Sequence, residues 1–241
     1  MPTNAPVMSD PLIRGGISLT IARLALTIDA PKPAPTAAQL RGALASVRPD
    51  LDLLHQHGRE GFIYRAPRVI YRVFRGTPTV VAVEEGVDAV FGLNLVGRSL
   101  RLGATQRQII DLTLRVSRDR IGEREQPRTY TFLKPWLALN QTNHKQFNSL
   151  VPHERREFLN RQIVNNCLSL SKSYGFHVTQ PLQAKTDLRP VTIRHKGISM
   201  LGFQGSFQVN FDIPDGLGLG KTISKGFGGV QGLENSKCNS S

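Results

Sequence analysis

Two histidines separated by one residue are the strongest candidates for chemistry in this sequence. His55 and His57 lie in the stretch HQHG, which we predict to be a loop. In an extended backbone, side chains at positions i and i+2 project to the same side, roughly 7 Å apart. Because imidazole titrates near neutral pH, such a pair is suited to general acid–base catalysis.

The histidine pair has two alternative interpretations. It fits an ordinary exposed loop without a function, and it fits a metal site if Asp50, Asp52 or Glu60 supplies a third ligand. The metal interpretation is the weaker one, because 31 Lys and Arg residues outnumber 18 Asp and Glu residues and leave few carboxylates for a site. We therefore predict chemistry without a metal ion or another cofactor.

The charge of the chain points to nucleic acid as a partner. The formal net charge is +13 over 241 residues, and nucleic acid is the commonest partner of so basic a protein. Solubilising surface charge is the alternative. Directly after the histidines, arginines mix with Tyr64 and Tyr71, a combination typical of RNA-binding surfaces. The predicted RNA contacts in this segment are Arg65, Arg68 and Arg72.

The segment GLGLGKTISKGFGGV, residues 216–230, is the most unusual in composition. It is not a nucleotide-binding P-loop, because Asp215 stands where the first glycine of that motif belongs and no helix pattern follows. A flexible tail is one alternative. The other is a loop whose backbone N–H groups approach an RNA phosphate closely, which glycine permits. The predicted RNA contacts in this segment are Gly218, Gly220, Lys221, Lys225, Gly226 and Gly228.

The elements that must position the histidines are predicted from hydrophobic periodicity. The first strand changes the phase of its alternation near Ala22, which predicts a bulge there. Thr36 and Gln39 form a capping box that begins a helix. Residues 62–65 and 69–74 are predicted to pair as a hairpin.

The second half of the chain repeats this order of elements. A long helix is predicted from Pro152 to Tyr174, with Gly175 as its stop, and no second helix is recognisable after it. The charged residues 118–127 suit a domain junction. Strand–helix–strand–strand occurring twice predicts an α+β fold of tandem ferredoxin-like domains with antiparallel sheets. The predicted division is a flexible leader at 1–15, an N-terminal domain at 16–122 and a C-terminal domain at 123–241.

Two of these stretches together resemble a known family. LRGALASVRPDLDLLHQHGREGFIYRAPRVIYRVFRG and the later GLGLGKTISKGFGGV resemble the CRISPR-associated repeat-processing endoribonucleases of the RAMP superfamily, in the branch with an H-x-H pair. The resemblance implies two RRM-type, ferredoxin-like domains and cleavage of precursor CRISPR RNA within its repeats. It also implies His57 as the main catalytic residue, His55 as its helper and Tyr64 as a third member of the site.

The residues agree with the chemistry that this resemblance implies. RNA carries its own nucleophile, the 2′-hydroxyl, so a base, an acid and nearby cations suffice for cleavage to a 2′,3′-cyclic phosphate. No lysine lies near the histidines in sequence, which leaves Arg48, Arg59, Arg65 or Arg68 to supply positive charge. Two rivals are a catalytically silent RAMP-fold subunit that only holds guide RNA and a metal-dependent nuclease.

The expected partner is CRISPR repeat RNA, both as precursor and as mature guide. Other subunits of a CRISPR effector complex and a second copy of the chain are further candidates. No apolar run reaches the length of about 18–20 residues that a membrane span needs, and the N-terminus lacks the pattern of a secretory signal. With two cysteines only, we expect a reducing, cytoplasmic setting and no membrane partner.

Overall fold

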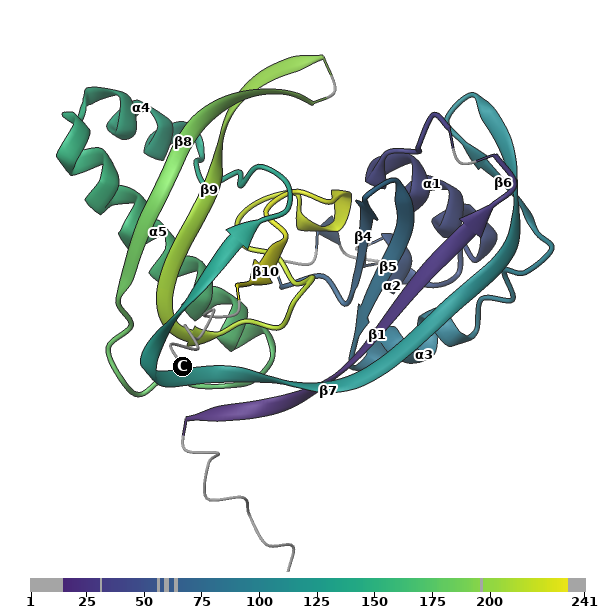
Figure 1. Ribbon diagram of the computed structural model, residues 1–241, viewed down its shortest axis with the longest axis horizontal. Helices are drawn as coiled ribbons and strands as arrows, with labels where there is room; N and C mark the ends of the chain where they lie inside the picture. The colour runs from purple at the N-terminus through teal and green to yellow at the C-terminus, as the bar shows by residue number, and fades with distance from the viewer. Residues whose placement is uncertain are drawn as a thin grey trace, which may run out of the picture.

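The computed structural model describes residues 15–30, 32–55, 57–58, 61–62, 65–195 and 197–233. In this part of the chain, one antiparallel sheet has the strand order β4-β5-β1-β7-β9-β8, and β6 and β10 also pair with β7 (Figure 1). The strands are β1 Gly16–Ile28, β2 His57–Gly58, β3 Gly61–Phe62, β4 Val69–Phe74, β5 Thr77–Val83, β6 Ser99–Leu102, β7 Thr105–Phe132, β8 Ala184–His195, β9 Ile198–Asp212 and β10 Val230–Gly232. The helices are α1 Ala37–Val47, α2 Asp52–His55, α3 Glu85–Phe91, α4 Gln141–Ser149, α5 Pro152–Ser173 and a 3-10 turn at Ile223–Lys225.

The N-terminal half is a ferredoxin-like domain. The elements β1, α1, β4, β5, α3 and β7 follow one another in the order βαββαβ, and their strands lie side by side as β4-β5-β1-β7. The predicted capping box begins α1: the Thr36 hydroxyl accepts a hydrogen bond from the backbone N–H of Gln39, and the Gln39 side chain accepts one from the Thr36 N–H. Leu40 and Leu44 of α1 are fully buried against this sheet.

The C-terminal half is a second ferredoxin-like domain that begins in the same strand in which the first one ends. Its strands lie in the order β10-β7-β9-β8, so β7 is the last strand of one domain and the first strand of the next. The connection from β9 to β10, where a second helix would stand, is the glycine-rich segment with a single 3-10 turn. The predicted tandem fold is confirmed. The sequence showed no second helix in this half, and in the structure the glycine-rich loop stands in its place.

The charged stretch 118–127, which was predicted to suit a domain junction, forms part of a strand. It lies within β7, where a register shift between Glu123 and Arg128 accommodates the extra residues. The Asp212 carboxylate on β9 accepts hydrogen bonds from Arg120 and, at 2.7 Å, from Arg124. The charges of this stretch hold two strands together across the position where two domains meet.

The prediction of a bulge near Ala22 was wrong. β1 pairs with β5 and β7 without a register shift there, and its shift lies between Thr27 and Ile28. The phase of alternation changes because β1 passes from one hydrophobic core to another on the opposite face of the sheet. Ile21 belongs to the core shared with the C-terminal half, whereas Ala22 and Leu24 belong to the core beneath α1.

The predicted hairpin has a different partner. β4 pairs with β5 through a turn at Arg75 and Gly76, which have φ values of 48° and 88°. Two consecutive residues with positive φ match the twist of a two-residue hairpin turn. Phe62 pairs instead with His57, in the small sheet of β2 and β3.

The long helix α5 is confirmed from Pro152 to Ser173, and Gly175 has a φ of 77° just beyond it. Its apolar stripe, which includes Ile163 and Cys167, is fully buried, and burial raises the pKa of the Cys167 thiol. Cys167 is thus a core residue, as predicted.

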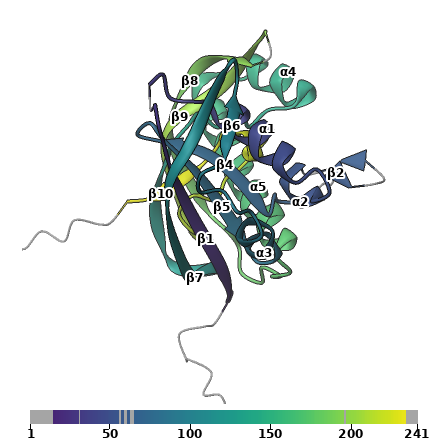
Figure 2. The ribbon, with the colours of Figure 1, turned by 90° about the vertical axis from the view of Figure 1, so that its right-hand side faces the viewer.

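Figure 2 shows strands β1, β7 and β9 on one side of the molecule and the helices on the other. Within the described residues, no helix is both long enough and apolar enough to span a membrane.

Candidate active site and nucleic-acid interface

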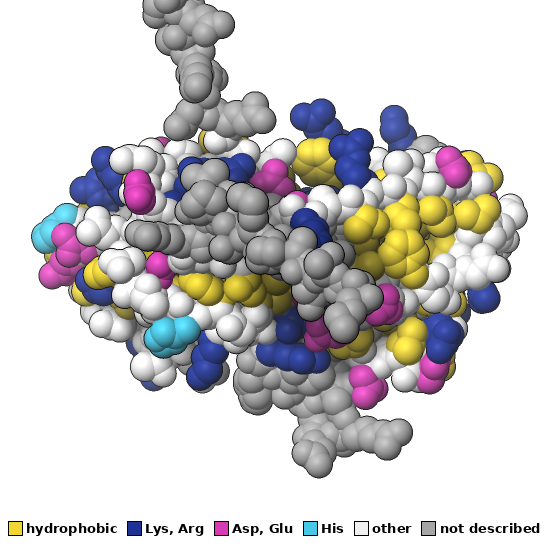
Figure 3. Space-filling view, turned by 90° about the horizontal axis from the view of Figure 1, so that it is seen from below, with side chains coloured by type: hydrophobic (Ala, Val, Ile, Leu, Met, Phe, Trp, Pro, Cys, Tyr) yellow, Lys and Arg dark blue, Asp and Glu magenta, His cyan; other side chains and the backbone are white. Residues whose placement is uncertain are grey.

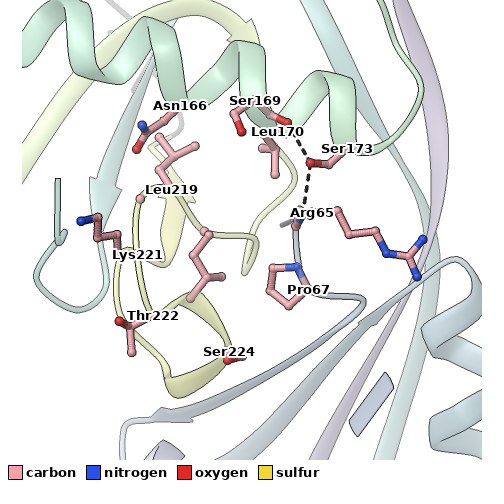
Figure 4. Close-up of a pocket in the computed structure, with 14 residues that line it drawn as sticks. Arg65, Pro67, Asn166, Ser169, Leu170, Ser173, Leu219, Lys221, Thr222 and Ser224 are labelled. Atoms are coloured by element: carbon pink, nitrogen blue, oxygen red, sulfur yellow. Dashed lines mark hydrogen bonds between the residues drawn. The ribbon is translucent and has the colours of Figure 1, made fainter. Parts of the chain in front are cut away.

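A cavity of about 460 Å³ lies where the two domains meet. One wall is the end of α5, a second is the glycine-rich loop, and a third is the segment that leads into β4 (Figure 4). Lys221 and Arg65 lie at opposite ends of it in Figure 4, and none of the described residues that line it is acidic. The lining residues are Arg65, Ala66, Pro67, Asn166, Ser169, Leu170, Ser173 and Gly218 to Ser224. This composition suits an anionic, hydrogen-bonding ligand.

The contribution of α5 to the cavity was missed by the sequence analysis. Asn166, Ser169 and Ser173 are spaced i, i+3 and i+7, so they share one face of the helix. The Asn166 amide oxygen accepts a hydrogen bond of 3.1 Å from the indole N–H of Trp136, which is fully buried. A row of small polar residues beside the apolar stripe was the signal in the sequence.

The segment directly after the predicted catalytic tyrosine is fastened to the end of α5. The Ala66 N–H donates a hydrogen bond of 3.1 Å to the Ser173 hydroxyl. The Arg68 guanidinium donates to the Ser173 carbonyl at 2.9 Å and to Glu85 at 2.7 Å, and it stacks 4.3 Å from the ring centre of Tyr174. Arg68 is therefore committed to protein contacts that fix the two domains against each other.

Arg65 differs from Arg68 in its exposure. Its side chain is 44% exposed against 10% for Arg68, and its ion pair with Glu85 is long, at 3.4 Å. Burial opposes the ionisation of Glu85, but hydrogen bonding to Arg68 and the two positive charges hold the pKa of that carboxyl below its usual value. Of the two arginines, only Arg65 has a side chain that is largely accessible to a ligand.

Arg72 lies inside the protein and holds the glycine-rich loop. Only 5% of the residue is exposed, and its guanidinium donates to the carbonyl oxygens of Gly216 at 2.9 Å, Leu217 at 3.1 Å and Gly226 at 2.8 Å. Burial lowers the pKa of Arg72 to about 10, so the group is still charged at neutral pH. The sequence predicts an RNA contact here, whereas every hydrogen bond described for this guanidinium goes to the loop backbone.

The predicted glycines divide between the cavity and the interior. Gly218 and Gly220 line the cavity, and Gly226 and Gly228 are buried behind it. A Cβ atom on Gly220 would lie 2.6 Å from the Trp136 indole nitrogen, so the loop packs against that ring only with glycine at this position. The sequence predicts that these glycines let the backbone approach an RNA phosphate. In the structure they let the loop approach the protein's own core.

The two lysines of the loop also differ. Lys221 is exposed at the cavity, and partial burial lowers its pKa. Its backbone N–H donates to the Leu137 carbonyl at 3.0 Å, which fixes the position from which the side chain extends. Lys225 is half-buried on the 3-10 turn and does not line the cavity.

We expect the Lys221→Ala/Lys225→Ala variant to bind repeat RNA more weakly and with a flatter salt dependence. Each lost phosphate contact should reduce the log–log slope of affinity against salt by about 0.7 for a single strand. The measurement is a salt titration with a repeat RNA made non-cleavable by a deoxyribose. Lys145→Ala, on the exposed face of α4 away from the cavity, is the matched control. An unchanged slope in the double variant would remove this loop from the RNA surface.

The histidine pair lies in a short excursion between α2 and β4. The sequence predicts a loop here, but His55 ends α2 and His57 begins β2, so the backbone is not one extended loop. The fully buried Tyr71 donates a hydrogen bond of 3.1 Å from its hydroxyl to the carbonyl oxygen of Leu54, which anchors α2 on β4. The imidazoles and Tyr64 lie outside the described residues, so their catalytic roles stay predictions.

The described residues contain no group of three His, Cys, Asp or Glu side chains close enough to hold a metal ion. The imidazoles are not among the described side chains, so the metal-free mechanism stays a prediction.

Two ferredoxin-like domains that share a strand, with a glycine-rich loop in the place of the last helix and a basic cavity beside it, define a tandem ferredoxin-like protein with a cavity at its domain junction. The chain belongs to the Cas6b family. Residues 18–119 match the Cas6b N-terminal domain and residues 122–233 match the Cas6b C-terminal domain. A relative from Methanocaldococcus jannaschii, the uncharacterized protein MJ0978, is 34% identical over 138 residues, 57% of this chain and 94% of the relative.

Solved structures of the same family are similar over nearly the whole chain. One described as a crystal structure of Cas6b is 27% identical with a TM-score of 0.83, covering 90% of this chain and 100% of that one. A second, described as the CRISPR RNA processing endoribonuclease Cas6b, is 25% identical with a TM-score of 0.72 over the same shares. A type IV Cas6 crRNA endonuclease, at 12% identity and a TM-score of 0.57, shares the fold.

Proposed function

We propose that this chain is an endoribonuclease that processes CRISPR RNA by cutting within the repeats, and that it does so without a metal ion. The observation that carries the proposal is that both Cas6b domains match in sequence and that the whole fold superposes on a CRISPR RNA processing Cas6b. These similarities favour an enzyme over the alternative, a silent RNA-holding subunit. Subunits of an effector complex, the division at residues 122 and 123 and a cytoplasmic setting are retained as proposals.

The proposed reaction is an internal transesterification of RNA. The 2′-hydroxyl of the nucleotide before the scissile bond loses its proton to His57 and attacks the phosphorus. The bond from phosphorus to the 5′-oxygen breaks, and that oxygen takes a proton from the second acid–base group, His55 or Tyr64. The products are a 2′,3′-cyclic phosphate and a free 5′-hydroxyl, so the atoms balance without water or an oxidant.

Positive charge is available for the phosphate at both ends of the cavity. Arg65 directly follows Tyr64 in the chain and lines the cavity, and Lys221 reaches it from the loop of the other domain. Charge development on the phosphorane is stabilised by cations placed in advance at a partly buried site. We therefore propose Arg65 and Lys221 as phosphate contacts.

The first experiment incubates purified protein with end-labelled repeat RNA in excess EDTA. We expect cleavage at one position, at an unchanged rate, because proton transfer by imidazole needs no metal. A deoxyribose immediately before the cleaved bond should abolish the product, since it removes the nucleophile. Activity lost on chelation and restored by Mg²⁺ or Mn²⁺ would contradict the metal-free mechanism, and tight binding without any product would favour the silent subunit.

A further inference from the structure

The long strand β7 has one edge that no described strand covers between its two ends. β1 pairs along one edge from Ile109 to Gly122. On the other edge, β6 pairs as far as Gln108, the Ile109 amide and carbonyl bond to Arg98 and Gly97, and β9 begins only at Gly122. Figure 1 shows this part of β7 at the rim of the N-terminal domain. Proteins normally cover or charge such an edge, because free N–H and C=O groups pair with other strands. Here the Leu112 N–H is bonded to the Asp111 carboxylate at 2.8 Å, a local contact that a pairing strand would replace.

The uncovered edge is also apolar on one face. Ile110, Leu114 and Val116 are 54%, 38% and 49% exposed, although Leu114 is paired with a residue of the core. Leu112 between them is half-buried and packs against the core beneath α1. Figure 3 shows exposed hydrophobic side chains gathered on this half of the molecule. Large aliphatic side chains in a row at a sheet edge indicate a surface that is covered in use.

The sequence of this edge, Ile110 to Val116, is complementary to itself. If a second copy pairs antiparallel about Thr113, Leu112 of each copy stands opposite Leu114 of the other, and Ile110 stands opposite Val116. On the opposite face, Asp111 of each copy stands opposite Arg115 of the other. Cross-strand pairs of this kind are the units that stabilise antiparallel sheets.

The charges select this register over its neighbours. Moving the centre of pairing by two residues, to Arg115, places Arg115 opposite itself and Asp111 opposite Asp119, both like-charged pairs. Within one copy, Arg115 is paired across β1 with Arg23, whose guanidinium is bound to Asp119 at 2.6 Å. Arg115 has no ion pair among the described residues, so the carboxylate of a second copy would meet an unsatisfied cation.

We propose that residues 110–116 bind a second copy of this chain, edge to edge, about a two-fold axis through Thr113. The two N-terminal sheets then join into one continuous sheet, and a two-fold axis perpendicular to it keeps the apolar face of one copy beside the apolar face of the other. None of residues 110–116 lines the cavity, so the contact leaves the proposed RNA site open. The inference does not depend on catalysis.

The test measures the dimer by sedimentation velocity over a range of protein concentrations, without RNA. Asp111→Arg should raise the dissociation constant about tenfold or more, because the symmetric interface contains the pair twice and each becomes repulsive. Asp111→Arg/Arg115→Asp should restore dimerisation, since the exchanged charges again face each other. Arg118→Asp, outside the paired stretch on the same strand, is the matched control, and thermal unfolding checks that each variant folds.

The register itself has a second test. Thr113→Cys, in a Cys238→Ser background, should give a disulfide-linked dimer under mild oxidation, because residue 113 meets itself at the axis, whereas Arg101→Cys on β6 should not. A wild-type chain that stays monomeric at high concentration overturns the proposal, as does a dimer that both charge reversals leave unchanged or that the exchange fails to restore. Cleavage of repeat RNA by a monomeric Asp111→Arg variant would show that catalysis does not require the dimer.

Discussion

Arg72→Met should lower the free energy of unfolding by about 3 kcal/mol or more, because three buried carbonyl oxygens would lose a charged donor together. The carbonyls belong to Gly216, Leu217 and Gly226, so the loss falls on the whole glycine-rich loop. Methionine retains much of the length and apolar stem of arginine. The measurement is urea unfolding of the purified protein, compared with the wild type.

Two further variants make this result specific. Arg72→Lys retains the charge but presents one ammonium to three carbonyls, so its loss of stability should lie between wild type and Arg72→Met. Arg101→Met, at an exposed arginine of β6, should change stability little. If Arg72→Met unfolds as the control does and instead loses RNA affinity, the guanidinium contacts RNA, as the sequence predicts, and our structural assignment is wrong.

His57→Ala should slow cleavage of repeat RNA on the order of 10²-fold or more, the usual contribution of a general acid or base. His55→Ala should cost less, because the resemblance assigns it the helper role. Affinity for a deoxy-substituted, non-cleavable repeat should change little in either variant, since phosphate binding depends mainly on lysine and arginine. The measurements are single-turnover cleavage rates and binding of the non-cleavable RNA.

The control for the histidine variants is His144→Ala, an exposed histidine on α4 that is absent from the cavity lining. Full activity of a His55→Ala/His57→Ala variant would show that the two histidines have no catalytic role. The polar face of α5 would then be the next place to test for the base. A loss of RNA affinity equal to the loss of rate would show instead that the loop around the histidines binds substrate.

Features that depend on neighbouring residues were predicted well from the sequence. Features that depend on pairing between distant strands were not. The capping box at Thr36 and the stop at Gly175 depend on neighbouring residues only, and both are confirmed. The phase change at Ala22 was misread as a bulge, because alternation alone cannot tell a kinked strand from a straight one that serves two cores. The stretch 118–127 was predicted to suit a domain junction, but its place within a strand could not be predicted, because its charges bond to a strand about 90 residues further along the chain.

The candidate site was predictable in its motifs and not in its division of labour. Composition identified the glycine-rich loop and the arginines after the histidines as one functional system. It could not separate Arg65, which is exposed, from Arg68 and Arg72, whose partners are backbone carbonyls up to 154 residues away. An arginine that holds a loop and an exposed arginine have the same letter in the sequence, and only the structure distinguishes their burial.

The strand shared by the two domains also limits how far the cleft between them can change its width. The wall that carries Arg65 and the walls that carry Lys221 and Ser169 belong to different domains, and β7 passes through both without interruption. A change in the distance between these walls would have to bend a hydrogen-bonded strand that is paired with β1 on one side of Gly122 and with β9 on the other. The fold therefore fixes the width of the cleft, and we expect any RNA that binds there to adapt its shape to it.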